Sequence, residues 1–201
     1  MSAINERRER ERAHRHQLII TAARELAETE GWEAVTTRRL AERVEYSQPV
    51  LYSHFNGKSA IVGAVALDGF SELAAHLRRA RQTAPEPGRA LRPVCRAYLD
   101  FATERPALYE AMFVLPTDLK FASAETPPPL RAAFDEFVSC FRPDNDRREL
   151  FAEVIWSALH GLAVLSDSGR IPPAGQEERL DFLIARIADT PGGLSGAASR
   201  R

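Results

Sequence analysis

Two short segments with helical spacing of apolar residues, joined by a tight connection, constrain the fold of this chain most strongly. The first, TTRRLAERV (residues 36–44), opens with Thr36, a favourable helix N-cap residue, and its apolar residues fall along one helical face. The second, QPVLYSHF (residues 48–55), follows Ser47, another candidate cap, and carries Pro49, which the first turn of a helix tolerates. Each helix has only about two turns, and the residues EYS join them, so the pair predicts a helix-turn-helix.

Helical spacing of apolar residues recurs along most of the remaining chain, and no segment shows a convincing strand pattern. We therefore expect an all-α fold, with an N-terminal three-helix helix-turn-helix domain and a C-terminal helical domain. Further helices are expected over residues 17–30, 58–81, 88–105, 106–113, 127–141, 146–165 and 175–189. The Pro- and Gly-rich segment at 82–88 marks a boundary between the helix-turn-helix domain, expected over 13–73, and the C-terminal domain, expected over 82–189. A basic flexible arm is expected over 1–12 and a loose tail over 190–201.

Composition excludes several classes of protein. Cys95 and Cys140 lack the spacing of metal ligands, so neither a zinc site nor a disulfide framework is expected. This cysteine usage predicts a reducing compartment. No single apolar run approaches the roughly 20 residues that span a bilayer, and the N-terminus lacks the apolar stretch of a signal peptide, which predicts a cytoplasmic protein without a membrane partner. The five histidines are scattered, and no nucleophile elbow or phosphate-binding glycine loop is present. We expect no enzyme activity, cofactor or metal.

The first sixteen residues are the basic part of a chain whose net charge is −1. They contain five arginines, at positions 7, 8, 10, 12 and 15, against three glutamates. One interpretation is a solvated, partly frayed helix start with i,i+4 ion pairs. The other is an arm that lies on a phosphate backbone.

Residues 47–55 divide by helical angle. Leu51 and Phe55 fall on one face and are the expected core anchors. The other side chains project away from these anchors, and a short helix that exposes glutamine, small residues, a phenol and an imidazole can enter a DNA major groove. Glutamine pairs with adenine edges, whereas tyrosine and histidine reach phosphates.

These residues carry a family resemblance. The segment TTRRLAERVEYSQPVLYSHFNGKSAI, with the preceding IITAARELAETEGWEAV, resembles the DNA-binding region of the TetR (tetracycline repressor) family over roughly residues 17–62. The resemblance implies that Thr37 binds a backbone phosphate and that Arg38 reads a guanine edge. It implies further contacts to double-stranded DNA, in the form of a palindromic operator, from Gln48, Pro49, Val50, Tyr52, Ser53, His54 and Lys58.

Structural roles remain open for some of these residues. Tyr52 could be a core residue, His54 a packed surface histidine, and Arg38 and Lys58 ordinary solvated charges. The chain also departs from the family pattern at Glu45, where members usually have glycine in the turn. If Glu45 adopts a positive φ, the strain is on the order of 1 kcal/mol, and the angle between the two helices decides whether Arg38 reaches a base.

The last two helical segments carry apolar stripes wide enough to face both a core and a partner, which predicts a homodimer. The alternative is that these stripes lie entirely in the core of one chain. The segments RAYLDFATERPALYEAMF and IWSALHGL resemble a TetR-like effector domain named for a Trp-His-Gly signature. The resemblance implies a pocket for a small apolar effector lined by Phe101, Leu108, Met112, Phe113, Phe134, Phe137, Trp156 and His160. Aromatic residues at helical spacing are also typical of a plain core.

Together these observations predict a DNA-binding transcriptional regulator, a repressor released from its operator when a ligand tilts the helix that begins at Lys58. The alternative is a helical module that binds small molecules or partners and has no role on DNA.

Overall fold

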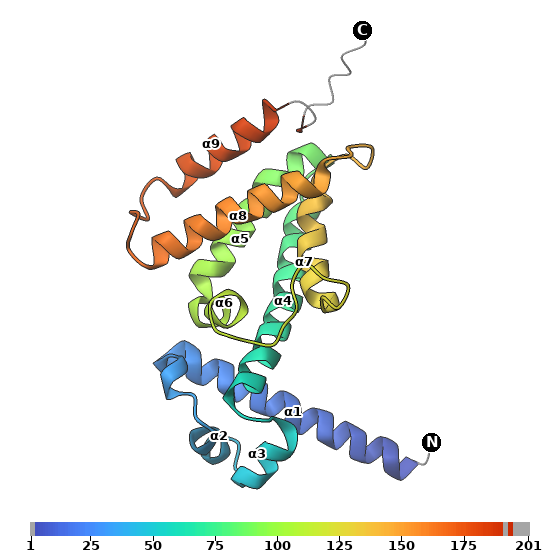
Figure 1. Cartoon of the computed structure of the whole chain (residues 1–201), viewed down its shortest axis with the longest axis vertical. Helices are drawn as coiled ribbons and strands as arrows, with labels where there is room; N and C mark the ends of the chain where they lie inside the picture. The colour runs from blue at the N-terminus through green and yellow to red at the C-terminus, as the bar shows by residue number, and fades with distance from the viewer. Residues whose placement is uncertain (1–2, 191–192, 195–201) are drawn as a thin grey trace. The chain divides into compact units, whose positions relative to one another are not determined.

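The computed structural model describes residues 3–190 and 193–194, and all regular structure in these ranges is helical, which confirms the predicted fold class (Figure 1). The helices are α1 (Ala3–Glu30), the 3-10 helix η1 (Trp32–Ala34), α2 (Thr37–Arg43), α3 (Gln48–His54), α4 (Lys58–Gln82), α5 (Pro87–Glu104), α6 (Pro106–Phe113), α7 (Pro128–Val138), α8 (Arg148–Asp167) and α9 (Gln176–Ala188). Helix α7 ends three residues earlier than the sequence predicted, and η1 was not predicted.

The described residues form two compact units. The first consists of the chain up to Gly69 together with Arg105–Pro127, and the second of Phe70–Glu104 with the residues from Pro128 onward. The division therefore falls inside α4, and the first unit contains α6 as well as the helix-turn-helix. The sequence-based boundaries had assigned α6 to the C-terminal domain.

The first unit is built on the buried stripe of α1. Ile19, Ala23 and Leu26 recur at helical spacing and are at most 2% exposed, and Leu40 of α2 and Leu51 of α3 are equally buried. Two further contacts join α1 and η1 to α6. The carboxylate of Glu28 accepts hydrogen bonds from the first free amides of α6, and the indole of Trp32 donates to the carbonyl of Ala107 (2.8 Å). These contacts explain why α6 belongs to this unit.

The second unit has a core in which α5, α7 and α8 pack together, with α9 against α5. Its largest fully buried side chains include Tyr98, Phe101 and Phe137. Glu136 is the one buried charged residue in the described chain, and its two oxygens accept hydrogen bonds from Arg78 (2.8 Å) and Arg81 (2.7 Å). Because both oxygens are paired, burial of this carboxylate is offset by charge-assisted hydrogen bonds that hold α7 on α4.

The N-terminal residues differ from the prediction of a flexible arm. Residues 3–12 are helical and continue into the body of α1, and only residues 1–2 lie outside the described part of this segment. Ion pairs from Glu11 to Arg7 (2.9 Å) and to Arg15 (3.6 Å) support these turns at i,i+4 spacing. The basic segment is therefore an extension of a helix.

Helices α4 and α8 are each long and apolar enough to cross a membrane by length and composition, which differs from the expectation drawn from the absence of a long apolar run. In α4, 50% of the most apolar window is buried inside the protein, and a core helix passes the same test. In α8 only 22% of that window is buried, so much of its apolar surface is left exposed.

Candidate DNA-binding site

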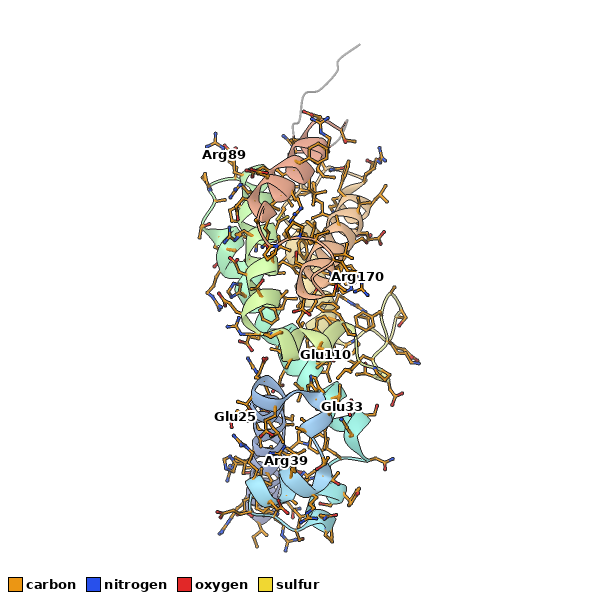
Figure 2. The ribbon with its side chains drawn as sticks, turned by 90° about the vertical axis from the view of Figure 1, so that its left-hand side faces the viewer. Glu25, Glu33, Arg39, Arg89, Glu110 and Arg170 are labelled. Carbon is orange, nitrogen blue, oxygen red and sulfur yellow. The ribbon has the colours of Figure 1, made fainter. Side chains whose placement is uncertain are left out.

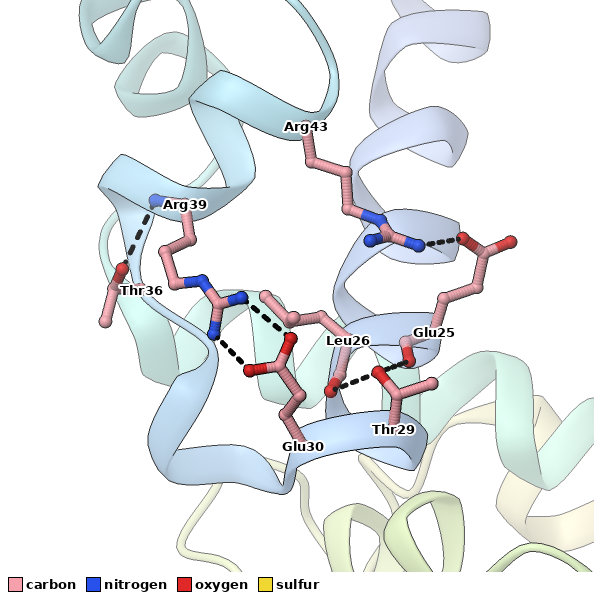
Figure 3. A network of polar contacts seen from close by, with 7 residues as sticks. All are labelled: Glu25, Leu26, Thr29, Glu30, Thr36, Arg39 and Arg43. Atoms are coloured by element: carbon pink, nitrogen blue, oxygen red, sulfur yellow. Dashed lines mark hydrogen bonds and ion pairs between the residues drawn. The ribbon is translucent and has the colours of Figure 1, made fainter.

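Helix α2 is held on α1 by two exposed ion pairs. The guanidinium of Arg39 donates two hydrogen bonds to the two oxygens of Glu30, both at 2.8 Å, and Arg43 donates to Glu25 at 2.9 Å (Figure 3). Glu25 and Arg39 are also labelled among the side chains of the first unit in Figure 2. The paired geometry with Arg39 lowers the pKa of Glu30 through its hydrogen bonds. Because the Arg39 contact is bidentate, it fixes the orientation of α2 more sharply than a single contact would.

The two ends of α2 are defined by local contacts. Thr36 is the N-cap, as predicted, and its hydroxyl accepts a hydrogen bond from the amide of Arg39 (3.2 Å). At the other end Glu45 has φ 57°, which confirms the positive φ considered for this position. The amide of Glu45 donates to the carbonyl of Glu42 (3.4 Å) and that of Tyr46 to the carbonyl of Ala41 (3.0 Å). This is the Schellman pattern, with a glutamate in the position that glycine usually occupies.

Helix α3 is anchored as the sequence predicts. Leu51 and Phe55 are 1% and 5% exposed, respectively. Gln48 and Pro49 are exposed, and Tyr52 is 55% exposed, which excludes the core alternative for this tyrosine. The outward face of α3 thus presents an amide, an apolar ring and a phenol to solvent, the set that base edges and phosphates require.

Other predicted contacts are already engaged within the protein. Ser47 is the N-cap of α3, but its side chain makes no capping hydrogen bond. Arg38 pairs with Glu42 (3.0 Å) on the exposed face of α2, and Ser53 donates to the carbonyl of Val50 (2.6 Å). The ammonium of Lys58 donates to the carbonyl of Trp32 (2.5 Å). A lysine ammonium has three donors, so this contact leaves donors for a phosphate.

His54 lies against α1, a contact that local pattern did not reveal. The ring of His16 stacks on Phe55 with centroids 4.3 Å apart, and it lies 6.1 Å from the ring of His54. The Nδ1 atom of His54 is buried without a hydrogen-bond partner. Burial lowers the pKa of His54, and the neighbouring His16, Arg12 and Arg15 lower it further. Arg12 and Arg15 of α1 therefore lie near the C-terminal end of α3.

Comparison with known proteins places this geometry in a family. Residues 19–65 match the model of bacterial regulatory proteins of the tetR family, and residues 91–187 match that of the tetracyclin repressor-like C-terminal domain. The chain belongs to the TetR family of transcriptional regulators. The match confirms the resemblance drawn from both halves of the sequence.

Individual TetR-family relatives match over shorter stretches. The chain is 34% identical over 95 residues to the uncharacterized HTH-type transcriptional regulator YobS of Bacillus subtilis, which is 47% of this chain and 49% of that protein. It is also 48% identical over 50 residues to the tetracycline repressor protein class C of Escherichia coli. Those 50 residues make up 25% of this chain and 23% of the repressor. The matched segments thus span half or less of these relatives' lengths.

One solved structure shows the fold over most of the chain. A TetR protein from Acinetobacter baumannii AYE, crystallised in complex with minocycline, superposes with a TM-score of 0.61 at 21% sequence identity. The superposition covers 85% of this chain and 94% of that protein. At this identity the likeness concerns the fold alone.

The residues predicted to line an effector pocket are divided between the two units. Leu108, Met112 and Phe113 lie on α6 in the first unit, and the other five lie in the second. Phe101 and Phe137 are at most 2% exposed, so they are core residues of the second unit, while Trp156 donates from its indole to the hydroxyl of Tyr98 (3.1 Å).

His160 is half-buried on α8, and burial lowers its pKa. A lowered pKa favours the neutral imidazole, which can both donate and accept a hydrogen bond. The assignment of His160 and the other seven residues to a ligand pocket stays a prediction.

Two cavities of the second unit involve α9. One, of about 560 Å³, is lined mainly by charged and polar residues of α5 and by the start of α9. The other, of about 420 Å³, is an open apolar groove between α8 and α9. Its lining residues are Ala158, Leu162, Glu178, Arg179, Phe182 and Leu183. Within the described residues no group of histidine, cysteine or acidic side chains has the arrangement to hold a metal ion.

Proposed function

We propose that this protein is a cytoplasmic homodimeric repressor that binds a palindromic operator in double-stranded DNA and releases it when a small apolar ligand binds to its C-terminal region. The observation that carries the proposal is the split of α3 into a buried face and an exposed face. Leu51 and Phe55 hold the helix, while Gln48, Pro49 and Tyr52 remain exposed to solvent. A helix fixed in this way can enter a major groove without rearrangement.

The nine proposed contact residues divide into two kinds. Arg38, Gln48, Pro49 and Val50 would read base edges, and their side chains lie on α2 and the first turn of α3. The backbone phosphates would be bound by Thr37, Tyr52, Ser53, His54 and Lys58. In this assignment Arg38 exchanges its exposed partner Glu42 for a guanine, at small cost because exposed ion pairs contribute little.

Dimer formation is proposed through α8 and α9. Leu150, Val154 and Leu165 of α8 are 39% to 49% exposed, and Phe182 of α9 is 68% exposed. The apolar groove between these helices lies beside Phe182. Large exposed apolar side chains that gather on two neighbouring helices are typical of a protein interface. A second copy of the chain would cover them and supply the second recognition helix of a palindromic site.

We propose that ligand binding causes release of the operator through α6 and α4. Leu108 and Met112 of α6 pack so closely on Gly69 of α4 that a Cβ atom there would lie 2.7 Å from the sulfur of Met112. The start of α6 is at the same time bonded to Glu28 and Trp32. A ligand that displaces Leu108 or Met112 would therefore act on α4 and α1 together, which biases the two-state equilibrium of the DNA-binding unit. The relative with minocycline bound supports a small-molecule effector of this general kind.

Selection from random duplexes followed by a salt titration tests the function. We expect the protein to enrich a palindrome and to lose affinity steeply as salt rises, since each phosphate contact adds about 0.9 to the slope of log affinity against log salt concentration. The double variant Arg38→Ala/Gln48→Ala should bind the operator no better than random duplex. If the wild-type protein fails to bind any duplex at low salt, the operator-binding proposal is wrong, and the alternative of a helical module without a DNA role replaces it.

A further inference from the structure

The N-terminal turns of α1 carry a basic stripe that the helix-turn-helix does not use. Arg8, Arg12 and Arg15 follow one another at i, i+4 and i+7 spacing, so they share one face of α1. The same face continues through Ile19, which is 0% exposed, into the core of the first unit. The basic stripe is therefore a continuation of the side of α1 that faces its neighbouring helices.

The stripe extends beyond those helices and begins beside α3. Figure 1 shows the first turns of α1 running past α2 and α3 toward the N-terminus. Arg12 and Arg15 lie close enough to His54, at the end of α3, to lower its pKa, and His16 of α1 stacks on Phe55, the C-cap of α3. Arginines of α1 thus extend from the C-terminal end of α3 along the first turns of α1, with Glu11 between Arg8 and Arg15.

The charges of this stripe are only partly neutralised. Arg15 shares Glu11 with Arg7, whereas Arg8 and Arg12 are exposed and have no ion-pair partner among the described residues. Arg8 lies near enough to Glu11 to contribute to the lowered pKa of that carboxyl, while Arg12 is about 60° round the helix axis from Glu9. With Nδ1 of His54 also buried and unpaired, the site combines free guanidinium groups with an unsatisfied imidazole. Exposed guanidinium groups of this kind can bind a phosphate through charge-assisted hydrogen bonds.

We propose that Arg8 and Arg12 bind backbone phosphates of the duplex that flank the half-site read by α3. The inference rests on the proposed function, because α3 must lie in the major groove for α1 to meet the adjacent backbone. Two features select DNA phosphate as the occupant: the sign of the charge, and the continuity of the stripe with the phosphate-binding end of α3. These contacts add affinity and length of footprint but no sequence preference, since phosphates are the same at every step.

A matched pair of variants tests the stripe. Arg8→Gln/Arg12→Gln removes two charges from the proposed face, and Arg7→Gln/Arg10→Gln removes two from other angles of the same turns. Operator affinity is measured against salt, on a duplex limited to the palindrome and on one extended by a full helical turn at each end. We expect the Arg8/Arg12 variant to lose the gain in affinity that the extension provides and to lower the salt slope by about 4 for a dimer, which makes four such contacts. The Arg7/Arg10 variant should behave as wild type.

The outcomes separate this inference from the proposed function. If both variants retain the wild-type salt slope and the wild-type gain from extended DNA, or if both lose them equally, α1 has no specific phosphate contacts and the inference is wrong, while operator binding by α3 stands. If wild-type protein binds no operator at all, the proposed function fails and takes this inference with it. Circular dichroism of both variants checks that the first turns of α1 remain helical.

Discussion

Glu45 holds a left-handed backbone conformation at the end of α2, where a residue with a side chain is strained. Its two turn hydrogen bonds, from the amides of Glu45 and Tyr46, keep this conformation in place. We expect Glu45→Gly to raise the free energy of unfolding by about 0.5 to 1 kcal/mol, because removal of the strain outweighs the added entropy of glycine in the unfolded chain. Denaturant unfolding monitored by circular dichroism measures the change.

Ala122 provides a comparison for this prediction. It also has a positive φ, 49°, but lies in the connection after α6 and far in sequence from the helix-turn-helix. Ala122→Gly should give a gain of similar size without a change in operator affinity. A Glu45→Gly variant less stable than wild type would mean that the glutamate side chain stabilises the turn by more than its backbone strain costs.

His54 should make stability depend on pH. Burial and the nearby positive groups lower its pKa below the ordinary value of 6.5, so the unfolded chain binds a proton that the folded chain resists. The unfolding free energy is therefore unaffected by protonation of His54 above pH 6.5, and it declines as the pH falls from 6.5 through the pKa of His54 in the folded state. We expect this decline to be smaller in His54→Gln, measured as unfolding free energy at a series of pH values. Burial lowers the pKa of His160 as well, so His160→Gln should also reduce the decline in unfolding free energy at low pH.

At the scale of elements, the sequence predicted the features that depend on residues close together in the chain, such as helix caps and core anchors. Thr36 as a cap, and Leu51 with Phe55 as anchors, follow from spacing within a few residues, and the structure confirms all three. The close association of α6 with α1 was not predictable in this way. It depends on Glu28 and Trp32, and the indole of Trp32 meets a carbonyl 75 residues away. The position of His54 against His16 likewise joins residues from two helices that no local period connects.

The contact between α1 and α6 leads to a prediction about Glu28. Its carboxylate accepts hydrogen bonds from the amides of Ala107 (3.3 Å) and Leu108 (3.0 Å), so it acts as the cap that Arg105 does not provide. We expect Glu28→Ala to lower the free energy of unfolding by about 1 kcal/mol or more, because two amides at a helix start lose their acceptor. Hydrogen exchange should show faster exchange of these two amides.

Glu25→Ala is the control for Glu28. Glu25 lies one turn earlier on α1, and its side chain forms an exposed ion pair with Arg43. Its removal should cost no more than about 0.5 kcal/mol and leave exchange at the start of α6 unchanged. Equal effects of the two substitutions would show that Glu28 contributes through its charge on α1 alone and that α6 is held by Trp32.

At the scale of the whole molecule, the proposed binding of a palindrome requires a second helix-turn-helix and therefore a surface that pairs two copies of the chain. Four large apolar residues of α8 and α9 are 39% to 68% exposed, and the sequence predicted apolar stripes on these helices without specifying which side chains remain exposed. The core of the second unit decides this: Phe151 and Ile155 face it and are buried, while Leu150 and Val154 are left outside.

Phe182→Glu tests whether these outside residues pair two copies of the chain. Phe182 is 68% exposed, so a charge there should leave the fold of the subunit intact, whereas in a dimer interface it would be desolvated without a partner. We expect a monomer by analytical ultracentrifugation at concentrations where wild type is a dimer, and at least a 100-fold loss of affinity for the palindrome with little loss for a single half-site. Val114→Glu, at an apolar residue 58% exposed in the first unit, should change neither property. A Phe182→Glu protein that remains dimeric would move the interface away from this part of α9, and the pairing of recognition helices would then need another surface.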